Sequence, residues 1–147
     1  MKPDLALAYC RMIAQTLGLD QDGLDTLVAN TGIDAHTLQT SDGFIDWPGA
    51  CQLIANAQHM SEAPDLALQT GLRALPAMHG PMGMAAMASP TLRDAMRVFA
   101  SFTNTRTRVF LTEMEETPDT ITLHLKFAYP LDDAIRFLTE SAMGSAY

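Results

Sequence analysis

One histidine, at position 79, stands in surroundings that suit the binding of a small molecule. It opens the segment His79-Gly80-Pro81, which breaks the chain before a predicted short helix. Gly80 supplies backbone freedom, and Pro81 suits the first turn of a helix because it has no N–H to leave unsatisfied. The imidazole can donate to a carboxylate or carbonyl, and the N–H groups of the helix start can bind an anion. The alternative is structural: the ring caps the turn or binds a backbone carbonyl.

Arginines form the second group that can do chemistry. Four of the nine basic residues gather in one region, namely Arg93, Arg97, Arg106 and Arg108. Arg93 and Arg97 are one helical turn apart and share a face, so they can bind an acidic effector or an acidic partner surface. The alternative is a solvated face paired with local acids such as Asp94 and Glu113. Arg73, before the break at Leu75-Pro76, can point into a cavity under the His79 loop.

Methionine is unusually frequent. Six of the ten methionines lie between positions 78 and 114, and four of them cluster at Met78, Met82, Met84 and Met87. Flexible thioethers can line an adaptable pocket for an apolar ligand, or they can simply fill gaps in a core. Our candidate ligand-binding set therefore combines polar and apolar side chains: His79, Arg73, Met78, Met82, Phe99 and Arg106.

Signatures of enzymes and of metal sites are missing from the sequence. It contains no GxSxG, P-loop, GxGxxG or HExxH motif, and its four histidines lack the spacing of metal ligands. Cys10 and Cys51 are far apart, which favours two reduced thiols over a disulfide or a metal site. We expect a protein that is not an enzyme, with no catalytic residues, no bound metal and no cofactor.

Composition describes an ordinary globular chain. The 147 residues are 48% hydrophobic and 18% charged, which suits one domain with a real core. The formal net charge of −8 argues against a general grip on nucleic acid. No apolar run is long enough to cross a bilayer and the N-terminus has no signal-peptide core, so we expect a cytoplasmic protein without membrane contact.

Helix-start signals recur along the first two-thirds of the chain. We expect helices or helical turns that start at Pro3, near Asp20 or Asp22, at Asp34, at Asp46 and at Pro64-Asp65. Gly18 is expected to end the first helix as its C′ glycine.

Two further helices are predicted on either side of Ser89-Pro90. The first covers residues 82–88, whose side chains are all small or flexible. The second takes Ser89 as its N-cap and Pro90 as its first residue, and its apolar face contains Leu92, Met96, Phe99 and Phe102.

A β-hairpin is predicted next. Residues 108–114 are rich in β-forming side chains, Pro118-Asp119 is a turn signal, and residues 120–127 alternate strictly between polar and apolar. A last helix is expected over residues 131–143. The fold class is therefore α+β: a helix-rich first two-thirds followed by an antiparallel hairpin and a C-terminal helix.

The segment PDLALQTGLRALPAMHGPMGMAAMASPTLRDAMRVF carries a family resemblance. Residues 17–127, and this segment above all, resemble the N-terminal effector-binding domain of AraC-type transcription regulators. The residues that carry the resemblance are Leu66, Leu68, Gly71, His79, Gly80, Gly83, Ser89, Thr91, Leu92 and Ala95.

The resemblance implies a regulator that contacts DNA through a separate C-terminal domain with two helix-turn-helix motifs. Nothing in residues 1–147 matches those motifs, so we expect one incomplete effector-binding or dimerisation domain, with the DNA-binding domain absent from this chain. The expected partners are a second copy of the chain and a small-molecule effector, with an apolar part and a carboxylate. A purely structural dimerisation or interaction module without a ligand is the alternative.

Overall fold

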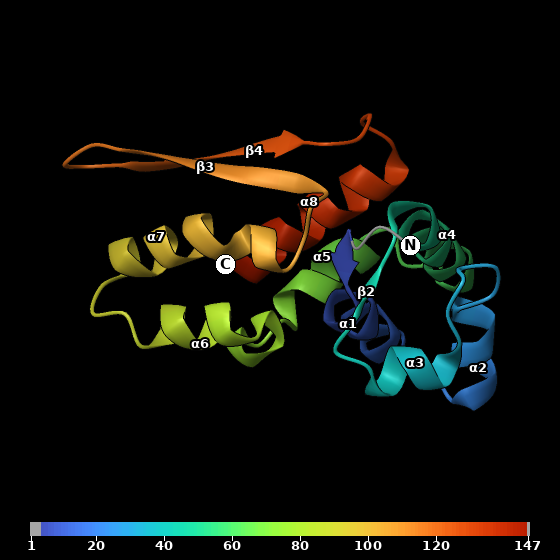
Figure 1. Ribbon diagram of the computed structural model, residues 1–147. Helices are drawn as coiled ribbons and strands as arrows, with labels where there is room; N and C mark the ends of the chain where they lie inside the picture. Colours follow the sequence, from blue (N-terminus) through green and yellow to red (C-terminus); the bar gives the residue numbers. More distant parts are fainter. Residues whose placement is uncertain (1–3, 147) are drawn as a thin grey trace. The chain divides into compact units, whose positions relative to one another are not determined.

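A computed structural model describes residues 4–146 and divides the chain into two compact units (Figure 1). Unit 1 combines the residues up to Ala74 with those from Leu131 onward, and unit 2 is Leu75–Pro130. Helices occur in both units, together with two small antiparallel sheets. The predicted α+β class, with a hairpin followed by a C-terminal helix, is confirmed.

Unit 1 is mainly helical. Its elements are β1 (Leu5–Ala6), α1 (Leu7–Leu17), α2 (Gln21–Leu27), α3 (Ala35–Thr40), β2 (Phe44–Ile45), α4 (Trp47–Met60), α5 (Leu66–Leu72) and α8 (Asp133–Ala146). Its core contains fully buried aliphatic side chains from most of these helices, including Leu7, Ile13, Leu27, Leu38, Leu53, Ile54 and Ile135. Burial of such side chains provides the main driving force for folding.

The first helix begins later than the sequence predicts. Leu5 and Ala6 are extended and pair with Ile45 and Phe44, so the prediction of a helix over them is wrong. Pro3, the expected start, lies outside the described residues. Two residues are too few to show strand periodicity, and their partner is far away in the sequence, so the sequence carries no local signal for this pairing.

Most predicted helix caps are confirmed. Gly18 ends α1 with φ 64° and ψ 38°. The carboxylates of Asp20, Asp34 and Asp46 each accept the backbone N–H three residues ahead, at 2.9, 2.6 and 3.0 Å. Each bond satisfies a donor that the helix itself leaves without a partner.

Glycines allow α5 and α8 to pack backbone against backbone. A Cβ on Gly71 would overlap the carbonyl oxygen of Ser141, and a Cβ on Gly144 would lie 2.8 Å from the carbonyl oxygen of Leu68. The helix α8 starts at Asp133, two residues after the expected start. Asp132 precedes it, and its carboxylate accepts the N–H of Ile135 at 2.9 Å.

Unit 2 contains two α-helices and the hairpin. Its elements are η1 (Pro76–His79), α6 (Pro81–Met87), α7 (Leu92–Phe102), η2 (Thr103–Thr105), β3 (Phe110–Glu116) and β4 (Ile121–Phe127). Within this unit α7 lies between α6 and the hairpin (Figure 1). In the hairpin Phe110 is opposite Phe127, and Glu116 is opposite Ile121.

The predicted start of α7 is wrong by two residues. Thr91, not Ser89, is the N-cap, and its hydroxyl accepts the N–H of Asp94 at 3.1 Å. The same hydroxyl donates to the Asp94 carboxylate at 2.7 Å, which gives a reciprocal capping pair. Ser89 instead donates to the carbonyl of Ala85 at 3.0 Å and so belongs to the end of α6.

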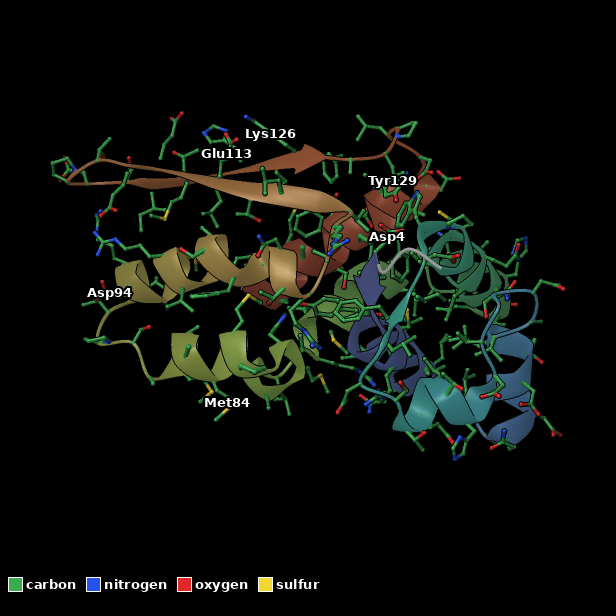
Figure 2. The ribbon with its side chains drawn as sticks, in the orientation of Figure 1. Asp4, Met84, Asp94, Glu113, Lys126 and Tyr129 are labelled. Atoms are coloured by element: carbon green, nitrogen blue, oxygen red, sulfur yellow. The ribbon has the colours of Figure 1, made fainter. Side chains whose placement is uncertain are left out.

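The two faces of the hairpin differ as predicted. One row of β4, Ile121, Leu123, Leu125 and Phe127, is half-buried, whereas Thr122, His124 and Lys126 are exposed. On the exposed face Lys126 pairs with Glu113 at 2.7 Å (Figure 2). His124 and Glu115 lie 3.5 Å apart beside them.

Candidate functional site

His79 lies at the end of η1, where the chain turns into α6. Its half-buried ring meets Phe99 of α7 edge to face, with ring centroids 6.3 Å apart and an interplanar angle of 78°. Gly80 follows with φ 64° and ψ −146°, a conformation that a side chain would strain. The HGP segment therefore places the imidazole at the end of the 3₁₀ turn η1, against Phe99 of α7.

Burial and a nearby cation act on the titration of His79. Partial burial, and then the positive charge of Arg106, lower the pKa of His79 below its ordinary value of 6.5. Near pH 7 the ring therefore has one N–H donor and one acceptor nitrogen. A neutral imidazole of this kind can hydrogen-bond either a carbonyl or a hydroxyl group.

Arg106 approaches the backbone of the same turn. A Cβ placed on Gly80 would lie 3.5 Å from both Cζ and Nη1 of Arg106. The half-buried guanidinium therefore lies within van der Waals reach of the loop, and it is the positive φ of Gly80, not lack of space, that disfavours a side chain there. Arg106 follows η2 directly, so the end of α7 and this 3₁₀ turn together set its position.

The methionine cluster divides into two pairs. Met82 is 4% exposed and Met78 is half-buried, whereas Met84 and Met87 are 56% and 65% exposed. Gly83, next to Met82, lets α6 pack against the backbone of η1, because a Cβ there would overlap the carbonyl oxygen of Pro76. Five of the six predicted site residues, namely His79, Met78, Met82, Phe99 and Arg106, belong to unit 2.

Arg73 belongs to the other unit. It is exposed and follows the last residue of α5, with its backbone N–H bonded to the carbonyl of Gln69 at 3.3 Å. The expectation that it contributes to a ligand site therefore stays a prediction.

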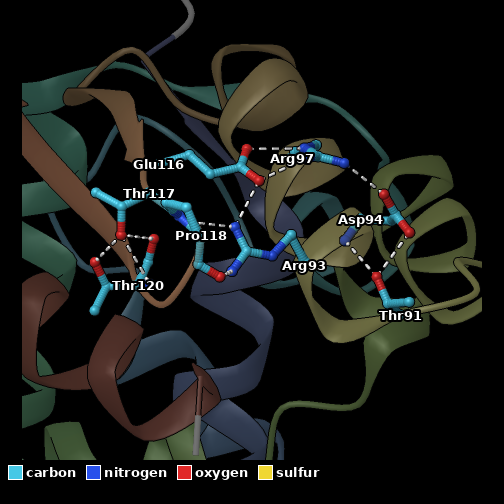
Figure 3. Close-up of polar contacts among 8 residues, drawn as sticks. All are labelled: Thr91, Arg93, Asp94, Arg97, Glu116, Thr117, Pro118 and Thr120. Atoms are coloured by element: carbon cyan, nitrogen blue, oxygen red, sulfur yellow. Dashed lines mark hydrogen bonds and ion pairs between the residues drawn. The ribbon is translucent and has the colours of Figure 1, made fainter.

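Arg93 and Arg97 take part in a local polar cluster (Figure 3). Arg93 donates to Glu116 at 2.6 Å and to the carbonyls of Thr117 and Pro118 at 2.8 and 2.9 Å. Arg97 bonds Glu116 as well, at 2.5 and 3.1 Å, and Asp94 at 2.8 Å.

This cluster joins α7 to the turn of the hairpin. Hydrogen bonds from Arg97, and then from Arg93, hold the pKa of Glu116 below its usual value. Pairing with local acids is confirmed for Asp94 and wrong for Glu113, which is bonded to Lys126 instead. On β3 the side chains alternate, so Glu113 faces away from the surface that Glu116 shares.

A family model described as the N-terminal arabinose-binding domain of AraC transcription regulators matches residues 18–147. The chain belongs to this family. The match covers all six candidate residues, and it confirms the resemblance found in the sequence. A comparison with curated proteins gives no match.

As a member of this family, the chain is a ligand-sensing or dimerisation domain of a transcription regulator. The family is a regulatory one and is not a known enzyme family. Both cysteines are free thiols, and burial raises the pKa of Cys10 to about 12. The pKa of Cys51 is raised to about 11 by burial and then by the charge of Asp132.

Neither a metal site nor a membrane span is found in residues 4–146 of this AraC-type domain. No group of three or more His, Cys, Asp or Glu side chains there could hold a metal ion. None of the helices within the same residues is long and apolar enough to cross a bilayer.

Sequence reasoning missed the role of Glu116. The sequence indicates both the hairpin turn and the shared face of Arg93 and Arg97. Only the strand register shows that Glu116 is the acid that pairs with these two arginines. The sequence does contain a signal for the N-cap of α7, namely the Thr-x-x-Asp spacing of Thr91 and Asp94.

Proposed function

We propose that this domain senses a small-molecule effector in unit 2, at a site formed by His79, Met78, Met82, Phe99 and Arg106. The observation that carries the proposal is the half-buried imidazole in edge-to-face contact with Phe99, with the cation of Arg106 close enough to lower its pKa. A few polar groups among apolar side chains are the usual composition of a ligand site.

The composition of this cluster favours an effector with an apolar part and a carboxylate. Arg106 supplies a positive charge for the carboxylate. His79, as a neutral ring, supplies a hydrogen bond to the effector without adding a second positive charge. Phe99 and Met78, both half-buried, provide apolar and polarisable contact surface, and Met82, which is only 4% exposed, supports them from the core. We extend the proposal to a cytoplasmic homodimer in which the effector biases a DNA-binding domain elsewhere in the regulator.

The experiment is a thermal-shift screen against carboxylate metabolites with aromatic or aliphatic bodies, followed by calorimetric titration. We expect a saturable stabilisation by at least one of them. Arg106→Gln should weaken binding roughly 10- to 100-fold, since hydrogen bonds to charged groups contribute about 1.5–3 kcal/mol. His79→Ala should weaken it roughly 3- to 10-fold.

The matched control is His36→Ala, an exposed histidine of α3 in unit 1. Its affinity should equal that of the wild type. Stabilisation by highly polar sugars alone would show that the effector class is wrong. An Arg73→Gln variant in the same titration tests the remaining predicted contact.

A second candidate function is a dimerisation module that binds no ligand. It is favoured by exposed apolar side chains around the α6–α7 connection: Met84, Met87 and Leu92 are 56%, 65% and 74% exposed. Exposed apolar patches often mark interaction surfaces. Concentration-dependent dimerisation in sedimentation experiments, with no response to any compound of the screen, would favour this candidate over the sensor.

A further inference from the structure

The strand β4 forms an open edge of the hairpin. In the described residues the sheet of unit 2 consists of β3 and β4 alone. Within this unit α7 and η2 pack against β3, and β3 is the main neighbour of β4 among the described elements. A two-stranded sheet is marginally stable by itself, so an open edge of this kind suits the addition of a further strand.

Two backbone hydrogen bonds fix the pattern of the ladder. The N–H of Ala128 donates to the carbonyl of Val109 at 2.8 Å, and the N–H of Thr117 donates to the carbonyl of Thr120 at 2.9 Å. Both bonds join residues that are directly opposite in the register of the seven strand pairs between them. Because bonded and non-bonded pairs alternate in an antiparallel ladder, every second pair counted from Val109 and Ala128 is a bonded one.

This alternation shows which backbone groups of β4 point out of the sheet. The residues whose backbone groups turn toward β3 are Thr122, His124 and Lys126. The residues whose N–H and C=O groups point to the open edge are Ile121, Leu123, Leu125 and Phe127. A further strand would bond to these four.

The side chains of the same four residues form a half-buried apolar row on the face that α7 covers. Phe127 and Leu125 are half-buried, although the residues opposite them on β3, Phe110 and Thr112, are only 9% and 7% exposed. Burial therefore decreases from β3 to β4. The edge offers backbone hydrogen bonds and apolar contact surface together, as strand addition requires.

The edge is also self-complementary. If two antiparallel copies of β4 meet about a two-fold axis at His124, all four outward-pointing residues gain a bonded partner. Ile121 then lies opposite the partner's Phe127, and Leu123 lies opposite the partner's Leu125. Apolar side chains meet apolar ones and no carboxylate opposes another, which favours the pairing. An axis at any other residue of β4 leaves at least one of the four without a partner in the strand.

We propose that β4 is a homodimer interface, at which a second copy of the chain continues the sheet in the order β3-β4-β4-β3. Four strands are a usual size for a stable sheet. This interface deepens the homodimer of the proposed function and rests on it. It contains none of the six candidate effector residues, and it differs from the exposed apolar side chains around the α6–α7 connection.

Disulfide cross-linking of the whole chain tests the register. His124 faces its own copy in a non-bonded pair with Cα atoms about 4.5 Å apart, which is within the range of disulfides. His124→Cys should therefore form a covalent dimer under mild oxidation. Thr122→Cys is the matched control, because its Cα would be roughly 14 Å from its copy, four residues along the strand. It should link no more than the wild type, which gives the background from Cys10 and Cys51.

Sedimentation over a concentration series measures the affinity, at physiological salt, where the net charge of −8 on each copy is screened. We expect a monomer–dimer equilibrium that Leu123→Lys weakens about ten-fold or more, because each dimer loses two apolar contacts and gains two charges. Leu111→Lys is the matched control: Leu111 is 51% exposed on the outer face of β3, so the affinity should change less than about two-fold. His124→Cys carries the test if Leu123→Lys lowers the melting temperature, since His124 is exposed.

Three results would overturn the proposal. The first is a monomer at every concentration with no extra linking of His124→Cys, which would mean that a strand of another protein or of another part of the regulator covers the edge. The second is an equal loss of affinity in Leu123→Lys and Leu111→Lys. The third is a dimer that Leu92→Lys disrupts and Leu123→Lys does not, which would place the interface at the α6–α7 connection.

Effector binding is measured separately, by the thermal shift of Leu123→Lys with the carboxylate metabolites. An effector response in a chain whose dimer does not use β4 would refute this interface alone. A β4 dimer with no effector response would support the interface and refute only the sensing function.

Discussion

At the scale of single residues, His79 is the central residue of the candidate effector site. Its place between η1 and α6, the missing side chain of Gly80 and the nearby guanidinium of Arg106 are three separate causes of its properties. The first two are local in sequence, and the third is not. The break at His79-Gly80-Pro81 could be predicted from residue types, whereas the approach of Arg106 depends on how α7 and η2 return the chain to this turn.

The pH dependence of stability tests the environment of His79. Its pKa is lower in the folded chain than its ordinary 6.5, so the unfolded chain takes up the proton first as the pH falls. The contribution of His79 to the free energy of unfolding is thus complete above pH 6.5, and it is lost as the pH falls through the folded-state pKa. Urea unfolding of His79→Gln should show a smaller loss of stability between about pH 7.5 and 5.5 than the wild type.

The control for this measurement is His36→Gln, which is exposed in α3 and should follow the wild type. An identical pH dependence in His79→Gln and the wild type would mean that the imidazole is not held in a desolvated, positively charged environment.

At the scale of elements, close packing of helices decides where glycine is required. Gly71 in α5 faces the backbone of α8 at Ser141, and Gly83 in α6 faces the backbone of η1 at Pro76. Backbone atoms cannot rotate away as a side chain can. Both glycines are visible in the sequence, but the backbone atoms that they contact are not. Ser141 is far from Gly71 along the chain, and Pro76 is in the separate turn η1, so both contacts follow only from the fold.

Gly71→Ala should destabilise the chain by about 1–3 kcal/mol, even though alanine favours helices, because overpacking against a backbone carbonyl outweighs propensity. Chemical denaturation measures this change. Gly23→Ala in α2 is the matched control, since the three atoms nearest to its new Cβ, at 3.1–3.2 Å, belong to the side chains of Leu19 and Asp20 and not to the backbone. Equal stability of the two variants would contradict the backbone contact.

The cluster at Glu116 should stabilise the attachment of the hairpin to α7. Glu116→Gln is expected to lower the melting temperature at neutral pH and low salt, and less so at high salt. The folded-state pKa of Glu116 is below 4.5, so its stabilisation exists above pH 4.5 and disappears as the pH falls through that folded-state value. Melting curves at several pH values measure this.

Glu115→Gln serves as the comparison. The Glu115 side chain is 77% exposed, and its contact with His124 is long, at 3.5 Å, so the loss of its charge should matter less. A larger effect at Glu115 than at Glu116 would contradict the role assigned to the cluster.

The elements themselves were predictable to different degrees. Caps at Asp20, Asp34 and Asp46 followed from residue type and spacing, and the alternation in residues 120–127 gave the second strand of the hairpin. The short pairing of β1 with β2 was missed because two-residue strands have no periodicity. The start of α7 was misplaced because two possible N-cap residues, Ser89 and Thr91, lie within one turn, and Pro90 suits the first helical position after Ser89.

At the scale of the whole molecule, charge sets the expected partners. A formal net charge of −8 on 147 residues repels nucleic acid, so DNA contact is expected to come from a separate domain of the regulator. Fluorescence anisotropy with duplex DNA should show no binding by this chain at physiological salt. Salt-sensitive binding in the micromolar range would contradict this expectation.

Native mass spectrometry tests the central claim, that the His79 cluster holds an effector, most directly. Wild type and His79→Ala would be purified in parallel from the same cells and measured before and after denaturation. We expect a small-molecule adduct on the wild type that is released on unfolding and is much reduced on the variant. An adduct kept equally by both proteins would contradict the site. A wild type with no adduct and no response to the metabolite screen would contradict the sensing function itself.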